Sequence, residues 1–315
     1  ARCGTRLAGN AAPKKILSDI VSVSTSGNGS FDESSPEVWT HTLAVAKDGS
    51  LYGWGCNAFG QITGTSPSNY EESTNIGEPT FMIGNIKQAS AGGGLSAAVT
   101  TSGALIVWGG AYSEEGPSSR VIKTDVAAVE VGSGHSGVLF ILNPDGTVEV
   151  MNAATRSAKK VMDDVEKIHG VEGYNASCLA LKKDGSLWLI ESGQFGDDTQ
   201  TTRIMNDVIS AAAYSRDLLE YEDKPLYVVN KAGQLLKSVD SNLKNFSVVM
   251  EGIVSVSAGR THALAVTTEG KVVAWGSNGA GQLGSGVTVF ETEKPVAVTG
   301  MNNALSVTVG GGGSF

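Results

Sequence analysis

The sequence predicts an all-β protein, a seven-bladed β-propeller of four-stranded blades, on three observations. Glycine supplies 41 of the 315 residues, nearly double the usual ~7%. Six β-hairpins of one design recur along the chain, each with a glycine at its turn. A short apolar strand precedes each hairpin, and the resulting unit of roughly 40 residues suits one blade of a propeller.

Each repeat is expected to open with a first strand. These strands begin near Ile20, Ile86, Val126, Val165, Val208, Ile253 and Ala304, the last of which has no hairpin after it. Successive starts lie 66, 40, 39, 43, 45 and 51 residues apart, a near-constant unit with insertions. Because no stretch shows a sustained 3.6-residue apolar period, an α-solenoid is excluded.

A hairpin of second and third strands follows each first strand. Asp-Gly or an equivalent pair separates two apolar runs, and glycine provides the positive φ that such a turn needs. The hairpin glycines are Gly49, Gly103, Gly146, Gly185, Gly233 and Gly270. The number of residues from the start of the first strand to the hairpin glycine varies from 17 to 29. The insertions therefore all lie between these two points, and we expect them to project from one face of the ring.

The two ends of the chain are predicted to share the seventh blade. Residues 1–13 are similar to the stretch that leads into a first strand, and Gly310 to Ser314 are similar to the loop that follows one. We therefore expect residues 1–315 to form a single propeller domain. Closure of the ring by both terminal segments would remove the exposed edge strands.

The repeats resemble the regulator-of-chromosome-condensation repeat family, whose members form seven-bladed propellers. The resemblance spans essentially the whole chain and is strongest in the first and sixth repeats. It is carried by Trp54-Gly55-Cys-Asn57, Gly60-Gln61, Trp275-Gly276-Ser-Asn278 and Gly281-Gln-Leu-Gly284. Family precedents include bacterial members such as the propeller-type β-lactamase inhibitory protein, which is secreted, and a nucleotide-exchange factor that also contacts nucleosomes.

Composition and motifs exclude several classes of function. With 23 Lys+Arg against 32 Asp+Glu the net charge is −9, which disfavours nucleic acid as a partner. No apolar run is long enough to insert into a membrane. Three scattered cysteines and four histidines show no metal-binding spacing, so we expect no metal and no cofactor. We also expect no catalytic residues, because no spacing assembles a nucleophile, a base and an orienting group.

Repeated histidines and tryptophans are interpreted as parts of the architecture. His41, His135 and His262 share one position in their repeats, where an imidazole can bind local backbone. Trp54, Trp108 and Trp275 share another position and should be mostly buried between blades.

The predicted function is non-enzymatic protein binding by a monomer, as an inhibitor or adaptor, through the face that carries the variable loops. Two alternatives stay open: a hydrolase, lyase or carbohydrate-binding propeller with a site at the channel mouth, and a regulator like the nucleotide-exchange factor. We favour a secreted or cell-surface location. Three matches to the Asn-x-Ser glycosylation pattern occur, but they do not establish secretion. The candidate partner-binding residues are Phe31, Trp39, Phe59, Tyr112, Tyr174, Phe195, Tyr214, Arg216 and Arg260.

Overall fold

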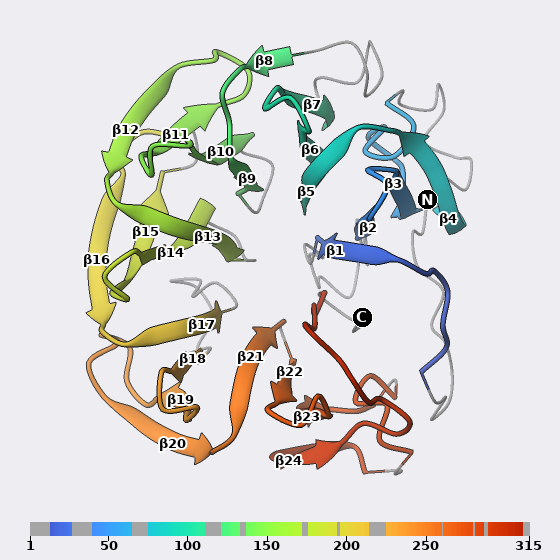
Figure 1. Ribbon diagram of the computed structural model, residues 1–315, viewed down its shortest axis with the longest axis vertical. Coiled ribbons are helices and arrows are strands. Elements are labelled where there is room, and N and C mark those ends of the chain that lie inside the picture. Colours follow the sequence, from blue (N-terminus) through green and yellow to red (C-terminus); the bar gives the residue numbers. More distant parts are fainter. Residues whose placement is uncertain are drawn as a thin grey trace, which may run out of the picture.

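The protein folds as a ring of antiparallel sheets (Figure 1). The structure is a computed structural model. It describes residues 13–26, 40–64, 75–110, 121–132, 137–171, 176–193, 196–213, 225–259, 261–279, 281–286 and 289–310. Within these residues no helix is long and apolar enough to cross a membrane.

Among the described residues, twenty-four strands form six four-stranded blades, each built from strands consecutive in the chain. Blades 1 and 2 consist of β1 (Ile20–Thr25), β2 (His41–Ala46), β3 (Leu51–Cys56), β4 (Asn75–Ile83), β5 (Ile86–Gly92), β6 (Leu95–Thr100), β7 (Leu105–Gly109) and β8 (Val121–Lys123). Blades 3 and 4 consist of β9 (Ala128–Val131), β10 (Val138–Leu142), β11 (Val148–Asn152), β12 (Ala158–Met162), β13 (Val165–Val171), β14 (Ala176–Lys182), β15 (Leu187–Ser192) and β16 (Gln200–Met205). Blades 5 and 6 consist of β17 (Val208–Ala213), β18 (Leu226–Asn230), β19 (Leu235–Ser238), β20 (Phe246–Met250), β21 (Ile253–Ala258), β22 (His262–Thr267), β23 (Val272–Ser277) and β24 (Glu291–Ala297).

The prediction of seven blades is wrong, because the described residues form six four-stranded sheets. The sector between β24 and β1 holds residues 298–310 and 13–19, which pair into no seventh sheet. A blade needs a hairpin to pair with its first strand, and no hairpin lies among these residues. Residues 1–12 and 311–315 lie outside the described residues, so the single domain shared between both ends stays a prediction.

The segment that was expected to be the seventh first strand nevertheless occupies the inner end of this sector (Figure 1). The Ala304 N–H donates to the Gly270 carbonyl of blade 6 at 2.9 Å. On its other side, the Thr308 hydroxyl donates to the Val23 carbonyl of blade 1 at 3.3 Å. One segment of chain therefore bridges blades 6 and 1 without building a sheet.

The six predicted hairpins are confirmed, and their turns also join the blades. Every predicted hairpin glycine has a φ between +74° and +90°. Each glycine carbonyl accepts a hydrogen bond from the backbone N–H that opens the next repeat, as from Val165 to Gly146 at 2.9 Å. Five of the six first strands in sheets start where predicted, and β9 starts two residues later, at Ala128.

The hydrophobic core is divided into six clusters: five lie between consecutive blades, and the sixth lies between blade 6 and residues 298–309 of the sector without a sheet. Trp108 is fully buried (0% exposed) against residues of blade 1, and Trp275 (5% exposed) packs against blade 5. The prediction of burial is thus confirmed for these two residues. Trp54 is only half-buried, because its repeat position faces the preceding sector, and the sector before blade 1 holds no sheet.

Candidate functional site

The two faces of the ring differ in the lengths of their connections. On one face, the hairpin face, the turns between second and third strands and the links from one blade to the next contain 2 to 5 residues. On the other, the loop face, the connections between first and second and between third and fourth strands contain 2 to 18 residues. Variation confined to one face of a rigid scaffold is typical of a recognition surface.

Of the nine predicted partner-binding residues, the structure describes one. Phe59 is half-buried, and its ring packs on Gly94 of blade 2, where an added Cβ would lie 3.0 Å from Cδ2. Its carbonyl accepts a hydrogen bond from the Gly110 N–H at 2.8 Å. Phe59 therefore helps to join blades 1 and 2 at the loop face. Outside the described residues lie Phe31, Trp39, Tyr112, Tyr174, Phe195, Tyr214, Arg216 and Arg260.

A side-chain amide organises the loop that follows the third strand of blade 1. The Asn57 Oδ1 atom accepts hydrogen bonds from the N–H groups of Ile62 (2.8 Å) and Thr63 (3.0 Å). Its Nδ2 donates to the Thr63 hydroxyl at 2.8 Å. Asn278 repeats this role in blade 6, where its Oδ1 accepts from the Leu283 N–H at 3.1 Å. The roots of these loops are therefore ordered by their own side chains.

A buried hydrogen-bond network links this loop root to blade 2. The Gln61 carbonyl accepts from the Trp108 Nε1–H at 2.8 Å and from the Ser96 hydroxyl at 2.7 Å. Because the Ser96 hydroxyl uses its hydrogen in the bond to Gln61, its oxygen accepts a hydrogen bond from the His41 Nε2–H at 2.8 Å. His41 Nδ1 then accepts from the Ser26 hydroxyl at 3.0 Å. The residues of the Trp-Gly and Gly-Gln motifs thus connect neighbouring blades beneath the loop face.

The described histidines of this repeat position are buried and neutral. Burial lowers the pKa of His41 to about 3 and that of His262 to about 4. The interpretation of these histidines as architectural is supported for His41, whose two ring nitrogens contact hydroxyls, those of Ser26 and Ser96, where the sequence predicts local backbone. His135 lies outside the described residues.

A second set of polar contacts joins the first strands near the axis of the ring. The Ser24 hydroxyl accepts from the Ala91 N–H, and the Ser257 hydroxyl accepts from the Val309 N–H, each at 3.0 Å. Blade 3 has Glu130 at the same position of its first strand. The Ser90 hydroxyl donates to Glu130 Oε2 at 2.8 Å, and the Gly170 N–H donates to the same carboxyl group.

This axial group contains the most perturbed carboxyl of the described residues. Burial raises the pKa of Glu130 to about 7, against the opposing effect of its two hydrogen-bond donors. Burial also raises the pKa of the nearby Cys178 thiol, and the charge of Glu130 adds to that rise. Desolvation lowers the pKa of the His169 imidazole as well.

Sequence reasoning missed Glu130, which carries no motif. The available signal was its repeat position, where blades 1, 2 and 6 have Ser24, Ser90 and Ser257. No group of three or more His, Cys, Asp or Glu residues that could hold a metal ion occurs within the described ranges.

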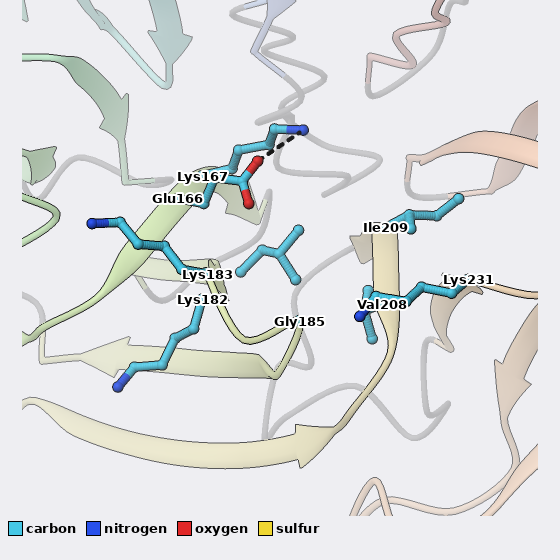
Figure 2. Close-up of a pocket in the computed structure, with 9 residues that line it drawn as sticks. Glu166, Lys167, Lys182, Lys183, Gly185, Val208, Ile209 and Lys231 are labelled. Carbon is cyan, nitrogen blue, oxygen red and sulfur yellow. Dashed lines mark ion pairs between the residues drawn. The ribbon is translucent and has the colours of Figure 1, made fainter.

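A shallow hollow of about 180 Å³ lies on the hairpin face between blades 4 and 5 (Figure 2). Leu181, Val208 and Ile209 contribute its apolar surface. The charged groups around it are largely paired, Lys167 with Glu166 at 3.8 Å and Lys231 with Asp207 at 3.3 Å. Figure 2 shows the ammonium groups of Lys182 and Lys183 directed away from one another rather than converging on the hollow.

Comparison with protein families identifies repeats at both ends of the described ring. Two models described as the regulator of chromosome condensation (RCC1) repeat match, one at residues 38–61 and 253–282 and the other at residues 269–315. The matched segments include Trp54-Gly55 and Trp275-Gly276.

Curated relatives align with most of this chain. The regulator of chromosome condensation of Homo sapiens is 24% identical over 86% of this chain and 66% of its own length. The secretion-regulating guanine nucleotide exchange factor of Bos taurus is 26% identical over 84% of this chain and 45% of its own length. The E3 ubiquitin-protein ligase HERC2 of Homo sapiens is 25% identical over 87% of this chain, which spans only 5% of that protein.

Solved structures with the same fold include two propellers. Human WBSCR16 superposes with a TM-score of 0.65 at 17% identity, over 93% of this chain and 85% of that one. Yeast RCC1 (Prp20), solved bound to Kap60, superposes with a TM-score of 0.64 at 18% identity, over 93% of this chain and 78% of that one. At such identities the likeness establishes the fold alone.

Proposed function

Because the chain is a propeller of the regulator-of-chromosome-condensation repeat type, we propose that it is a non-enzymatic regulator that binds a partner protein on its loop face. It acts as a monomer, in the role of an inhibitor or adaptor. The observation that carries the proposal is the contrast between connections of 2 to 5 residues on the hairpin face and up to 18 on the loop face.

The loop roots support this assignment. A surface that binds a protein tightly loses little entropy when its groups are held in place before binding. The Asn57 amide and the network of His41, Ser96 and Gln61 hold the roots of blade 1 and join them to blade 2. Two of the relatives are a regulator of chromosome condensation and a secretion-regulating guanine nucleotide exchange factor, and a regulatory role for this chain agrees with both names.

A second candidate function is nucleotide exchange on a GTPase, which the name of the bovine relative favours. A hydrolase or lyase at the axis is less well supported. Among the described residues near the axis, the carboxyl with a raised pKa is that of Glu130, which already receives hydrogen bonds from Ser90 and Gly170 and so has a structural task.

Partner capture with variants of the two faces tests the proposal. The partner is isolated on the wild-type chain from the lysate and medium of the source organism, identified by mass spectrometry, purified and titrated in a binding assay. Replacing Tyr112, Tyr174 and Tyr214 together with Ala should weaken binding at least 10-fold. The matched variant on the hairpin face replaces Lys167, Lys183 and Lys231 with Ala and should bind as the wild type does.

Unchanged binding by the tyrosine variant, with an unaltered melting temperature, would refute the loop face as the binding surface. Loss of binding in the lysine variant would place the partner on the hairpin face instead. If the partner is a GTPase, accelerated release of its bound nucleotide would establish the second candidate function. With a net charge of −9, attraction to a neutral or basic partner surface should weaken with added salt.

A further inference from the structure

The connection between β23 and β24 presents an aromatic side chain to solvent. Phe290, the residue before β24, is 79% exposed, more than any other aromatic residue that the structure describes. Its neighbour Val289 is also exposed. This connection joins a third strand to a fourth, so it belongs to the loop face. Single exposed apolar residues are common on protein surfaces, and what distinguishes Phe290 is how firmly it is held.

The backbone of Phe290 is fixed by Asn278, at the other root of the same loop. The Phe290 carbonyl accepts a hydrogen bond from the Asn278 N–H at 2.7 Å, and the Val289 carbonyl accepts one from Asn278 Nδ2 at 2.9 Å. The next residue, Glu291, pairs with Ser277 where β23 and β24 lie side by side (Figure 1). The backbone that carries the exposed ring therefore continues the ladder of blade 6.

The ring of Phe290 is seated on Gly279. A Cβ added at position 279 would lie 3.2 Å from both Cε2 and Cζ of the ring. Glycine thus lets the ring rest on the backbone, and a larger residue there would displace it. A side chain that is already held in place loses little entropy when a partner covers it.

We propose that Phe290 is an anchor residue of the loop face, whose ring enters an apolar pocket of the partner protein. The inference rests on the proposed function, because its occupant is the partner of that same face. Aromatic side chains that fill a pocket are among the largest contributors to binding between proteins. Glu291 and Glu293 are exposed beside Phe290 in β24, with Lys294 as the cation of that strand, and the chain carries a net charge of −9. By charge complementarity, we expect basic side chains at the rim of the partner's pocket.

Matched phenylalanine variants of the full chain test the anchor. They are titrated with the purified partner that the wild-type chain captures. Phe290→Ala should weaken binding about 10-fold or more, with an unchanged melting temperature because the ring is mostly solvated in the free chain. The control is Phe81→Ala. Phe81 is also exposed, but it lies on β4 near the hairpin-face end of that strand, so this variant should bind as the wild type does.

A second variant moves the ring without deleting it. Gly279→Ala places a methyl group where the ring rests, and the atoms that must yield belong to the far end of the Phe290 side chain. Binding should therefore weaken while the melting temperature stays the same. In a Phe290→Ala background, Gly279→Ala should have no further effect on binding, because the ring that it displaces is already absent.

Cross-linking identifies what the ring contacts. The photo-reactive amino acid p-benzoylphenylalanine is placed at position 290, and the complex with the purified partner is irradiated. Mass spectrometry should locate the adduct in an apolar pocket of the partner that is bordered by Lys or Arg. The same amino acid at position 81 should give no adduct.

The outcomes separate this inference from the proposed function. If Phe290→Ala binds normally while the variant lacking Tyr112, Tyr174 and Tyr214 does not, the anchor is overturned and the loop face stands. Normal binding by both variants, or no partner captured by the wild type, would overturn both proposals. Loss of binding in Phe290→Ala alone would support the anchor and reassign the loop-face contacts to it. Adducts at position 290 that lie only on polar surface, or that also form at position 81, would overturn the anchor.

Discussion

His41 Nε2 lies 2.8 Å from Ser96 Oγ, so an imidazole of blade 1 is held by a hydroxyl of blade 2. Because Ser96 donates its own hydrogen to the Gln61 carbonyl, the contact requires a proton on His41 Nε2. Burial disfavours a second proton on this imidazole and lowers its pKa to about 3, so the join between the blades is sensitive to acid.

The stability of the protein should fall in acid because of His41. Its pKa is about 3 in the folded state and 6.5 when exposed, so the unfolded chain binds the proton more tightly. The contribution is fully present above pH 6.5 and is lost progressively as the pH falls toward 3, to the extent of a few kcal/mol. Urea unfolding at pH 7.5 and 4.5 should show a smaller loss in His41→Gln than in the wild type. Equal losses would contradict the prediction, and His262→Gln provides the comparison for the second buried histidine.

Tyr227→Phe should destabilise the contact between blades 5 and 6. The Trp275 Nε1–H donates to the Tyr227 hydroxyl at 2.9 Å. The two rings pack edge to face, with their centroids 5.2 Å apart. Removing the hydroxyl leaves a buried N–H without its acceptor, which costs about 1–3 kcal/mol. In a Trp275→Phe background the same substitution should cost much less, as a double-mutant cycle by thermal unfolding would reveal. Equal costs in the two backgrounds would exclude the bond as the cause.

Trp108→Ala should cost more than Trp54→Ala. Trp108 is fully buried between blades 1 and 2, so its truncation should lower the free energy of unfolding by about 3–5 kcal/mol. Trp54 occupies the same repeat position but is half-buried beside the sector that holds no sheet. Chemical denaturation of the two variants measures the difference, and equal losses would mean that Trp54 is packed as tightly as its counterpart.

Gly55→Ala should destabilise blade 1, whereas Gly77→Ala should not. Gly55 has a φ of +102°, and an added Cβ would lie 2.6 Å from the Thr40 carbonyl oxygen, so the cost should be about 2–3 kcal/mol. For Gly77, on β4, no atom of the described residues beyond its two chain neighbours lies within 4 Å of an added Cβ. Melting temperatures of the two variants give the comparison. An unchanged melting temperature in Gly55→Ala would show that the contact with Thr40 does not require a glycine after Trp54.

The regular parts of the fold were predictable because each has a local cause. A glycine such as Gly146 must adopt a positive φ at its turn, and the apolar runs around it alternate in a way that specifies a hairpin. The count of blades was not predictable in this way. Ala304 to Gly310 carry the pattern of a first strand and contact both neighbouring blades, but a sheet depends on pairing partners that a strand pattern cannot supply.

The candidate site was predictable only as a face. Insertions in the repeat show where the long connections lie, since their lengths can be counted in the sequence. The role of a single side chain depends on contacts across blades: the packing of Phe59 on Gly94 of the next blade could not be read from the sequence, and its place in partner binding stays a prediction. Glu130 was missed for the same reason, because its partners Ser90 and Gly170 are 40 residues away in either direction.

The hydrogen bond from each hairpin glycine carbonyl to the next repeat restricts how the number of repeats can change during evolution. A carbonyl such as that of Gly185 is satisfied by Val208 of the following blade, not by its own. Deleting part of a blade leaves one acceptor and one donor unmet at the junction. Duplicating or deleting a complete repeat supplies or removes both together, so the size of such a ring changes most readily in steps of one whole blade.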